Sequence, residues 1–195
     1  MLKAILSGML LVGPLMALET QQNLKQLISE NQIQNRIKEV AHQLNQEYQG
    51  KEITFIMVMK GSFILMADLI REITVPCQVE AVQAMSYGQN GTVSGALTLK
   101  GLEGLSLKDR HVILIDDIFD TGKTMTSIRD QLLLQEPASL KTLVLLLKNR
   151  PRSISYTPDY VLFPVENEFV IGYGLDYKEL YRGLRGICIV EGGFE

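Results

Sequence analysis

Three carboxylates and two hydroxyls lie close together in the middle of the chain, around a glycine. Residues 112–124 read VILIDDIFDTGKT, so that Asp116 and Asp117 are adjacent and Asp120 follows shortly after. Carboxylates can accept protons, bind sugar hydroxyls or bind hard cations. Hydroxyl groups and the backbone N–H groups beside a glycine can instead hold a phosphate. The stretch therefore predicts a site for a ligand that carries both phosphate and hydroxyl groups, such as a phosphorylated sugar.

The elements on either side would place these groups at one edge of a sheet. Residues 112–115 are an apolar run rich in β-branched residues, which is typical of a strand buried on both faces of a parallel sheet. After the polar loop, Met125, Ile128, Leu132 and Leu133 recur at helical spacing. This order places the loop at the carboxyl end of the strand, where open α/β sheets bind ligands. The free N–H groups at the start of the helix favour a phosphate there.

Two other interpretations fit parts of the stretch. Gly122, Lys123 and Thr124 match the end of the P-loop pattern G-x-x-x-x-G-K-[ST], but Asp117 stands where that pattern has its first glycine. An acid at that place would repel the phosphates. The second interpretation is an ordinary turn with solvated acids, which does not account for three acids within five positions.

The stretch resembles the phosphoribosyl-diphosphate (PRPP) binding motif of the type I phosphoribosyltransferases. Further matches resemble the hypoxanthine-guanine branch of that family, occur in the family's order and extend from about residue 27 to the C-terminus. They are Leu27-Ile28-Ser29-Glu30, Met59-Lys60-Gly61-Ser62, Ser86-Tyr87, Lys148, the stretch EFVIGYGLDY at residues 168–177, and Arg182. The string FVIGYGLDY is what indicates the purine-specific branch.

The resemblance implies roles for the matched residues. Asp120 would be the catalytic residue that takes or shares the proton at nitrogen seven of the purine. The PRPP-binding residues would be Lys60, Gly61, Ser86, Tyr87, Asp116, Asp117, Thr121, Gly122, Lys123, Thr124 and Arg182. The purine-binding residues would be Lys148, Phe169, Val170 and Asp176. Phe169 would stack on the base and Lys148 would hydrogen-bond its six-position oxygen. A core position for Phe169 and a plain edge charge for Lys148 are the alternatives.

The cofactor that the resemblance implies is Mg²⁺. Asp176 would ligate it, and Asp116 or Asp117 would contribute through the ribose or a water. The chain departs from the family at Asp116, where the family usually has Glu. The side chain is shorter by about one carbon–carbon bond, so we expect its ribose or metal contact to need a water.

Further elements can be placed along the chain. Ser29 and Gln32 form a weak capping box at the start of a helix. Strands are predicted over residues 53–59, 77–85 and 140–147, and a short pair of strands over residues 160–163 and 169–171 is predicted beside the main sheet. The turn after residue 59 resembles the pyrophosphate-binding loop, with a strained or cis Met59–Lys60 peptide bond expected. Residues 86–95 are either a surface hairpin or, as the resemblance implies, a lid over PRPP.

These elements predict an α/β fold of the type I phosphoribosyltransferase kind. A parallel sheet of about five strands would be flanked by helices, with a small C-terminal hood that also uses part of the N-terminal region. We expect residues 1–26 to be an apolar and polar N-terminal extension and residues 27–195 to be the phosphoribosyltransferase domain. Residues 1–18 superficially resemble a secretory signal, but two glycines and a proline break their apolar run.

The predicted function is purine salvage. The enzyme would transfer the 5-phosphoribosyl group from PRPP to N9 of hypoxanthine or guanine, giving IMP or GMP and pyrophosphate. The alternative is a PRPP-sensing regulatory protein of the same fold without catalysis. With 195 residues and a net charge of −3, the chain suits one globular domain without a nucleic-acid surface. We expect a cytoplasmic homodimer or homotetramer that binds neither nucleic acid nor a membrane.

Overall fold

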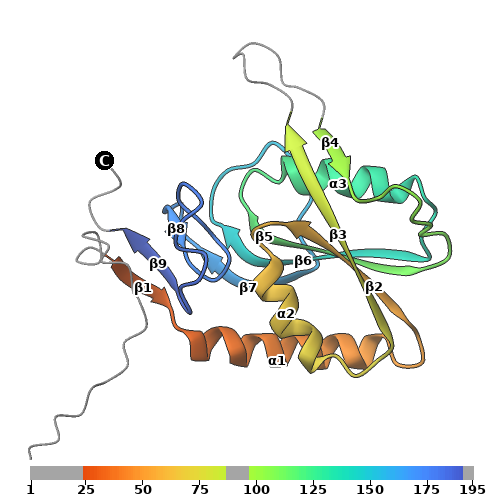
Figure 1. Cartoon of the computed structure of the whole chain (residues 1–195), viewed down its shortest axis with the longest axis horizontal. Helices are drawn as coiled ribbons and strands as arrows, with labels where there is room; N and C mark the ends of the chain where they lie inside the picture. The colour runs from red at the N-terminus through yellow and green to blue at the C-terminus, as the bar shows by residue number, and fades with distance from the viewer. Residues whose placement is uncertain (1–23, 87–96, 191–195) are drawn as a thin grey trace, which may run out of the picture.

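The computed structural model describes residues 24–86 and 97–190. Within these residues a central sheet separates two helices on one face from a third helix on the other (Figure 1). Its strands, in spatial order, are β4 (Leu97–Lys100), β3 (Cys77–Ser86), β2 (Ile53–Met59), β5 (His111–Phe119), β6 (Ser139–Lys148) and β7 (Tyr160–Val165). The helices are α1 (Glu30–Glu47) and α2 (Phe63–Glu72) on the first face and α3 (Lys123–Leu133) on the second. The predicted α/β class is confirmed.

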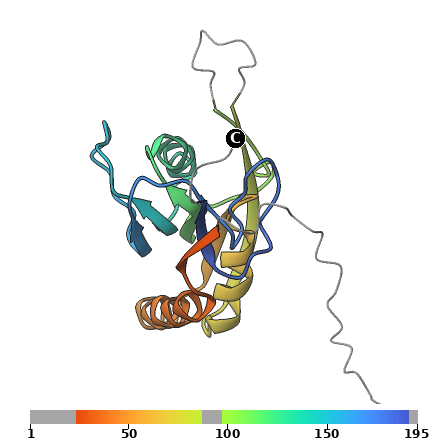
Figure 2. The ribbon, with the colours of Figure 1, turned by 90° about the vertical axis from the view of Figure 1, so that its left-hand side faces the viewer.

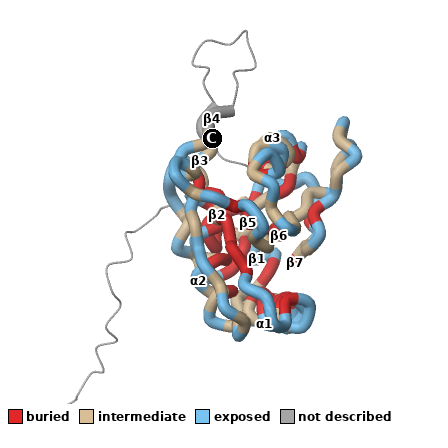
Figure 3. The backbone as a smooth tube through the Cα atoms, turned by 90° about the vertical axis from the view of Figure 1, so that its right-hand side faces the viewer, coloured by how far each residue is buried: buried red, intermediate tan, exposed pale blue. Residues whose placement is uncertain are grey.

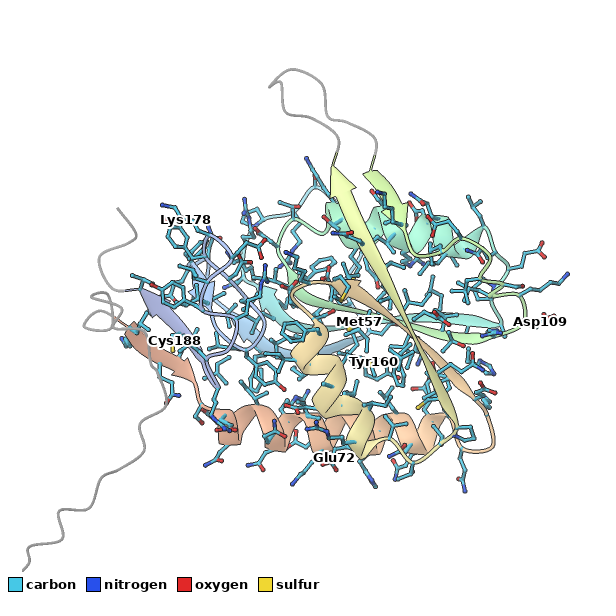
Figure 4. The ribbon with its side chains drawn as sticks, in the orientation of Figure 1. Met57, Glu72, Asp109, Tyr160, Lys178 and Cys188 are labelled. Atoms are coloured by element: carbon cyan, nitrogen blue, oxygen red, sulfur yellow. The ribbon has the colours of Figure 1, made fainter. Side chains whose placement is uncertain are left out.

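The main sheet is parallel except at one edge. The strands β3, β2, β5, β6 and β7 run parallel to their neighbours, and β4 pairs antiparallel with β3. The five parallel strands match the predicted number. Asp109 lies just before β5, and Lys178 lies in the loop between β8 (Val170–Ile171) and β9 (Ile187–Val190). Figure 4 shows these two residues at opposite ends of the molecule.

Two apolar layers hold the helices against the sheet, and the central strands contribute to both. Figure 3 shows that these strands run through the buried part of the molecule. The layer under α1 and α2 includes Ile33, Ile37, Leu44, Phe55, Leu65, Ile113 and Leu145. The layer under α3 includes Ile56, Val58, Val112, Leu114, Met125, Ile128 and Leu132. Alternate residues of β5 therefore face opposite layers, as expected for a strand buried on both faces.

The start of α1 shows how closely the local sequence determines an element. The Ser29 hydroxyl accepts a hydrogen bond from the Gln32 backbone N–H at 3.3 Å, and the Gln32 side chain accepts one from the Ser29 N–H at 2.9 Å. This is the predicted capping box, which satisfies two N–H groups at the helix start. The predicted apolar stripe from Ile33 to Leu44 is buried along the same helix.

A second, smaller sheet forms the predicted hood. It consists of β1 (Leu24–Ile28), β9 (Ile187–Val190) and β8 (Val170–Ile171) in that order, paired antiparallel. Leu24 pairs with Val190, so that the two ends of the described chain meet in the hood. Figures 1 and 2 place the hood beyond the carboxyl ends of β5 and β6.

Two details of the sequence prediction were wrong. Residues 160–163 and 169–171 do not pair with each other: β7 is the edge strand of the main sheet, and β8 belongs to the hood. Leu162 and Val165 of β7 pack into the core under α1, which explains why this strand joins the main sheet. Leu133 is 42% exposed, because adjacent helical residues point about 100° apart and Leu132 takes the buried direction.

Some sequence predictions fall outside the described residues. They include residues 1–23 of the extension predicted over residues 1–26, whose last three residues lie in β1, and the lid or hairpin at residues 86–95, apart from Ser86 at the end of β3. Over the two described ranges, no helix combines the length and the apolar character needed to cross a membrane.

Candidate active site

A polar cleft of about 460 Å³ opens where β5 ends and the hood begins. It is built from the loops that follow β2 and β5 and from the hood loop between β8 and β9. Its lining includes Lys60, Gly61, Asp116, Asp117, Asp120, Thr121, Gly122, Thr124, Asp176 and Arg182. All ten had been singled out from the sequence, and they come from segments that are far apart along the chain.

Asp116 and Asp117 form a tightly packed pair at the end of β5. Asp116 is only 7% exposed, and its Oδ1 accepts a hydrogen bond from the Asp117 backbone N–H at 2.9 Å. Asp117 Oδ1 accepts one from the Ile118 N–H at 2.9 Å. Burial, and then the charge of Asp117, raise the pKa of Asp116 well above its usual value, and burial raises the pKa of Asp117 as well. The pair therefore holds a proton more tightly than exposed carboxyls do.

Two glycines let three segments approach each other around this pair. A Cβ on Gly61 would lie 1.5 Å from Asp117 Oδ2, and a Cβ on Gly174 would lie 2.0 Å from the Gly61 carbonyl oxygen. Gly174 has φ +101°, a conformation that residues with a side chain rarely adopt. The hood loop, the loop after β2 and the end of β5 are thus stacked in direct contact.

The loop after β5 presents an open helix N-terminus to the cleft. Gly122 is the N-cap of α3 with φ +77°, and no side chain caps the helix from that position. A Cβ there would lie 2.1 Å from Ile154 Cδ1 and 2.6 Å from Phe119 Cζ, so only glycine fits. The Lys123 N–H reaches the Thr121 hydroxyl at 3.4 Å. The first turn of α3 can therefore offer N–H groups and its partial positive charge to an anion.

Asp120 is held by two arginines from the loop after β6. Arg150 Nη1 donates to Asp120 Oδ1 at 2.8 Å, and Arg152 Nε donates to the Asp120 carbonyl oxygen at 2.9 Å. Arg152 also donates to the Lys148 carbonyl and lies over the Phe119 ring, 5.3 Å from its centroid. The side chain and the backbone of Asp120 are both fixed by one neighbouring loop.

A third cluster of charges lies on the hood side of the cleft. Glu179 Oε2 accepts hydrogen bonds from Lys60 Nζ at 3.0 Å and from Arg182 Nη2 at 3.1 Å. Arg182 Nη2 also lies 2.8 Å from Asp176 Oδ1, and its Nη1 donates to the Gly174 carbonyl at 2.7 Å. The cations at 60 and 182 thus share one carboxylate and face the same cleft. The Met59–Lys60 peptide bond is cis, as expected.

Comparison with known proteins agrees with this geometry. The family model for the phosphoribosyl transferase domain matches residues 23–178. The chain belongs to the phosphoribosyltransferase family. It is 40% identical to the hypoxanthine phosphoribosyltransferase of Haemophilus influenzae, with 81% of this chain and 90% of the relative covered. It is 38% identical to the hypoxanthine-guanine phosphoribosyltransferase of Aquifex aeolicus, with 87% and 96% covered.

Solved structures place the chain in the same family. A ternary substrates complex of a point mutant of the Trypanosoma cruzi hypoxanthine phosphoribosyltransferase matches with a TM-score of 0.81 and 36% identity. The match covers 90% of this chain and 98% of that one. The predicted family and the type I phosphoribosyltransferase fold are therefore confirmed.

The residues that the family resemblance assigned to the purine are less tightly grouped. Phe169 is 53% exposed and packs edge-on against Tyr177, with ring centroids 5.8 Å apart, so the alternative of a core position is wrong. Val170 is buried in β8. Lys148 lines a neighbouring depression together with Arg152 and not the main cleft. Of the four, Asp176 alone lines the main cleft in the described residues.

Two of the residues predicted to bind PRPP, Ser86 and Tyr87, have side chains outside the described part of the chain. Tyr87 lies outside the described residues, and of Ser86 the structure defines only the backbone at the end of β3. Lys123, the first residue of α3, is exposed and does not line the cleft.

The sequence did not predict three residues that form hydrogen bonds with the candidate site residues Asp120 and Arg182. Arg150, Arg152 and Glu179 each contact a candidate site residue, but none belongs to a motif considered above. One signal was available for the arginines. They flank Pro151 directly after the strand that ends at Lys148, and basic residues at that end of a parallel sheet would face the acids after β5.

Proposed function

We propose that the protein is a hypoxanthine-guanine phosphoribosyltransferase of purine salvage. It transfers the 5-phosphoribosyl group of PRPP to N9 of hypoxanthine or guanine and releases pyrophosphate. The observation that carries the proposal is the position of Asp120. It lies between the open N-terminus of α3 and the acidic end of β5, in the cleft that Arg182 also lines. The relatives named above are transferases, which favours the enzyme over a PRPP-sensing regulator.

The loop after β5 binds the sugar phosphate. The N–H groups at the start of α3 and the hydroxyls of Thr121 and Thr124 hold the 5′-phosphate, because an uncapped helix start favours an anion. The carboxylates of Asp116 and Asp117 accept hydrogen bonds from the ribose hydroxyls. Lys60 and Arg182, which line the same cleft from the other side, hold the pyrophosphate.

The transfer needs one bond to break, one to form and one proton to move. The bond from C1 of the ribose to the pyrophosphate oxygen breaks, and its electron pair leaves with that oxygen. The N9 lone pair of the purine forms the new bond to C1. Asp120 accepts the proton from N7, which keeps the purine product neutral. Departure runs ahead of attack, so the sugar resembles an oxocarbenium ion, as in glycoside hydrolysis.

Mg²⁺ fits this site only together with the substrate. No group of three or more His, Cys, Asp or Glu side chains in residues 24–86 and 97–190 is arranged to hold a metal ion. Asp176 offers hard carboxylate oxygens in the cleft, with Asp116 and Asp117 available through the ribose or a water, and PRPP oxygens complete the set. When bound, Mg²⁺ neutralises charge on the pyrophosphate.

The purine lies on the hood side of Asp120. Phe169 is exposed enough for its ring to stack on the base, and the Val170 backbone meets the edge of the base. Lys148 hydrogen-bonds the six-position oxygen. For this contact the Lys148 side chain turns from its neighbouring depression toward the cleft.

The enzyme works in the cytoplasm, where PRPP is made, as a homodimer or homotetramer. Support for an assembly comes from a solved relative, the Trypanosoma cruzi enzyme, whose study concerns the effect of its C-terminal region on oligomeric state and activity. That relative matches with a TM-score of 0.79 and 39% identity.

Ultraviolet difference absorbance tests the proposed function. The purified protein is mixed with PRPP and Mg²⁺ and with hypoxanthine, guanine or xanthine in turn, and the mononucleotide product is identified by its mass. We expect turnover with hypoxanthine or guanine that requires both PRPP and Mg²⁺. If PRPP binds but no mononucleotide forms with any of the three bases, the protein is not this enzyme.

A further inference from the structure

Arg150 makes a charged contact with the carboxylate to which we assign the proton. Its Nη1 lies 2.8 Å from Asp120 Oδ1, and the two side chains are 37% and 38% exposed. The residues are 30 positions apart, on the loops that follow the adjacent parallel strands β5 and β6. The contact therefore connects two loops at the ligand-binding edge of the sheet.

The neighbouring Arg152 fixes the backbone beneath this contact. Its Nε donates to the Asp120 carbonyl at 2.9 Å, and its Nη2 donates to the Lys148 carbonyl. Its guanidinium also covers the Phe119 ring. Arg152 fixes the position of the Asp120 backbone. The ion pair with Arg150 therefore determines only how the Asp120 side chain is oriented.

The contact with Arg150 leaves one carboxylate oxygen for a ligand. Arg150 engages Oδ1, and an arginine stays charged throughout the accessible pH range. Without this partner, the Asp120 side chain could rotate toward the N–H groups at the start of α3, which attract carboxylates. In that orientation it would compete with the 5′-phosphate and would point away from the purine.

We propose that Arg150 is a positioning residue that directs the Asp120 carboxylate toward the purine and away from the phosphate-binding amides. This inference rests on the proposed function, since it takes Asp120 as the proton acceptor. Arg150 touches Asp120 and acts on the reaction through it. A purely structural role is a poor alternative, because half-exposed ion pairs contribute little to folding stability.

A double-mutant cycle tests the proposal. The parent, Arg150→Gln, Asp120→Asn and the double variant are compared by steady-state kinetics in which PRPP is varied up to saturation while Mg²⁺ and hypoxanthine are held saturating. We expect Arg150→Gln to lower kcat by roughly tenfold, within the ~10²-fold that a small misplacement of a reacting group can cost. The KM for PRPP should stay within about twofold of the parent, as expected when ground-state binding is unchanged. In the Asp120→Asn background, Arg150→Gln should have no further effect on kcat.

Two further variants serve as a conservative substitution and as a control. Arg150→Lys keeps the charge but loses the planar fork, so it should recover part of the lost kcat. Arg185→Gln is the matched control, because Arg185 forms an exposed ion pair with Glu30 at 2.7 Å, outside the cleft lining. It should retain the parent kcat.

The outcomes separate this proposal from the proposed function. If the parent makes no mononucleotide, the proposed function fails before any variant is measured. If Asp120→Asn is slow but Arg150→Gln turns over at the parent rate, the function stands and the positioning role is wrong. The role is also wrong if the two effects on kcat multiply, or if Arg150→Gln raises only the KM for PRPP. Parent-like turnover by Asp120→Asn would overturn the role of Asp120 and that of Arg150 with it.

Discussion

Gly61 lies directly against the carboxylate of Asp117. A Cβ at residue 61 would be 1.5 Å from Asp117 Oδ2 and 2.3 Å from Cγ, which is far inside van der Waals contact. The loop after β2 and the acidic end of β5 are therefore fitted to each other, and Gly174 packs against the backbone carbonyl of Gly61. The glycine at 61 sets where the Asp117 carboxylate can lie.

Gly61→Ala should damage PRPP binding. The added methyl group must push the Asp117 carboxylate away from its place, so we expect kcat/KM for PRPP to fall by at least about tenfold, as for a misplaced binding group. Steady-state kinetics with varied PRPP measures this. Gly183→Ala is the matched control, since a Cβ at that residue would meet nothing within 4 Å. Equal values of kcat/KM for Gly61→Ala and the parent would show that the contact has no role.

Asp116→Asn should stabilise the ligand-free protein at neutral pH. The pKa of Asp116 is raised by burial and by Asp117, so the folded chain binds this proton more tightly than the unfolded chain does. The resulting stability is complete below the ordinary Asp pKa of about 3.9 and is lost as the pH rises through the folded-state pKa. The amide of asparagine does not titrate, so the Asp116→Asn variant does not lose stability in this way as the pH rises. Thermal unfolding at pH 7.5 should therefore show a Tm higher than the parent's by at least about 2 °C.

The pH dependence distinguishes this effect from a change in packing. The gap in Tm between Asp116→Asn and the parent should narrow as the pH falls through the raised folded-state pKa of Asp116, because the folded parent then regains its proton. It should be smallest below about pH 3.9, where the parent carboxyl is protonated in both the folded and the unfolded state. Asp130→Asn is the control, with a side chain that is 65% exposed on α3. A gap of constant size across this pH range would rule out the titration of Asp116 as its cause.

Glu179→Gln should tighten PRPP binding. The Glu179 carboxylate contacts both Lys60 and Arg182, and the hydrogen bonds from these cations, Lys60 first, lower the pKa of Glu179. A pyrophosphate group must compete with this carboxylate for the same two cations. We expect the KM for PRPP to fall by about two- to fivefold, the scale of a modest surface ion pair. Glu39→Gln, which removes an exposed partner of Arg36 on α1, should leave the KM unchanged. An increased KM in Glu179→Gln would mean that Glu179 organises the site and does not compete with the ligand.

Local signals predicted the elements that carry the site. The apolar run of β5, the polar loop and α3 are contiguous in sequence, so periodicity and the acids at 116, 117 and 120 were sufficient to place them. The capping box at Ser29 is equally local. The purine-specific string came from a family resemblance, since Phe169 or Asp176 alone would indicate only a loop or a turn.

Contacts between segments that are distant along the chain could not be predicted from local sequence patterns. Arg150 meets Asp120 only because β6 lies beside β5, and a strand's neighbours are set by packing and not by its own pattern. The hood likewise depends on pairing between Leu24 and Val190. For the same reason β7 was wrongly paired with β8: both are short apolar runs, and nothing in either one tells which sheet it joins.

Single-turnover kinetics of two matched variants tests the central claim most directly. Asp120→Asn and Asp117→Asn each replace one carboxylate by an amide of the same shape, and the rate of mononucleotide formation is measured with enzyme in excess over PRPP. Asp120→Asn should slow the chemical step by about 10²–10⁴-fold while PRPP affinity changes little, as expected for lost proton transfer. Asp117→Asn should weaken PRPP binding with a smaller effect on that step. If Asp120→Asn formed mononucleotide from hypoxanthine at the parent rate, Asp120 would not be the proton acceptor.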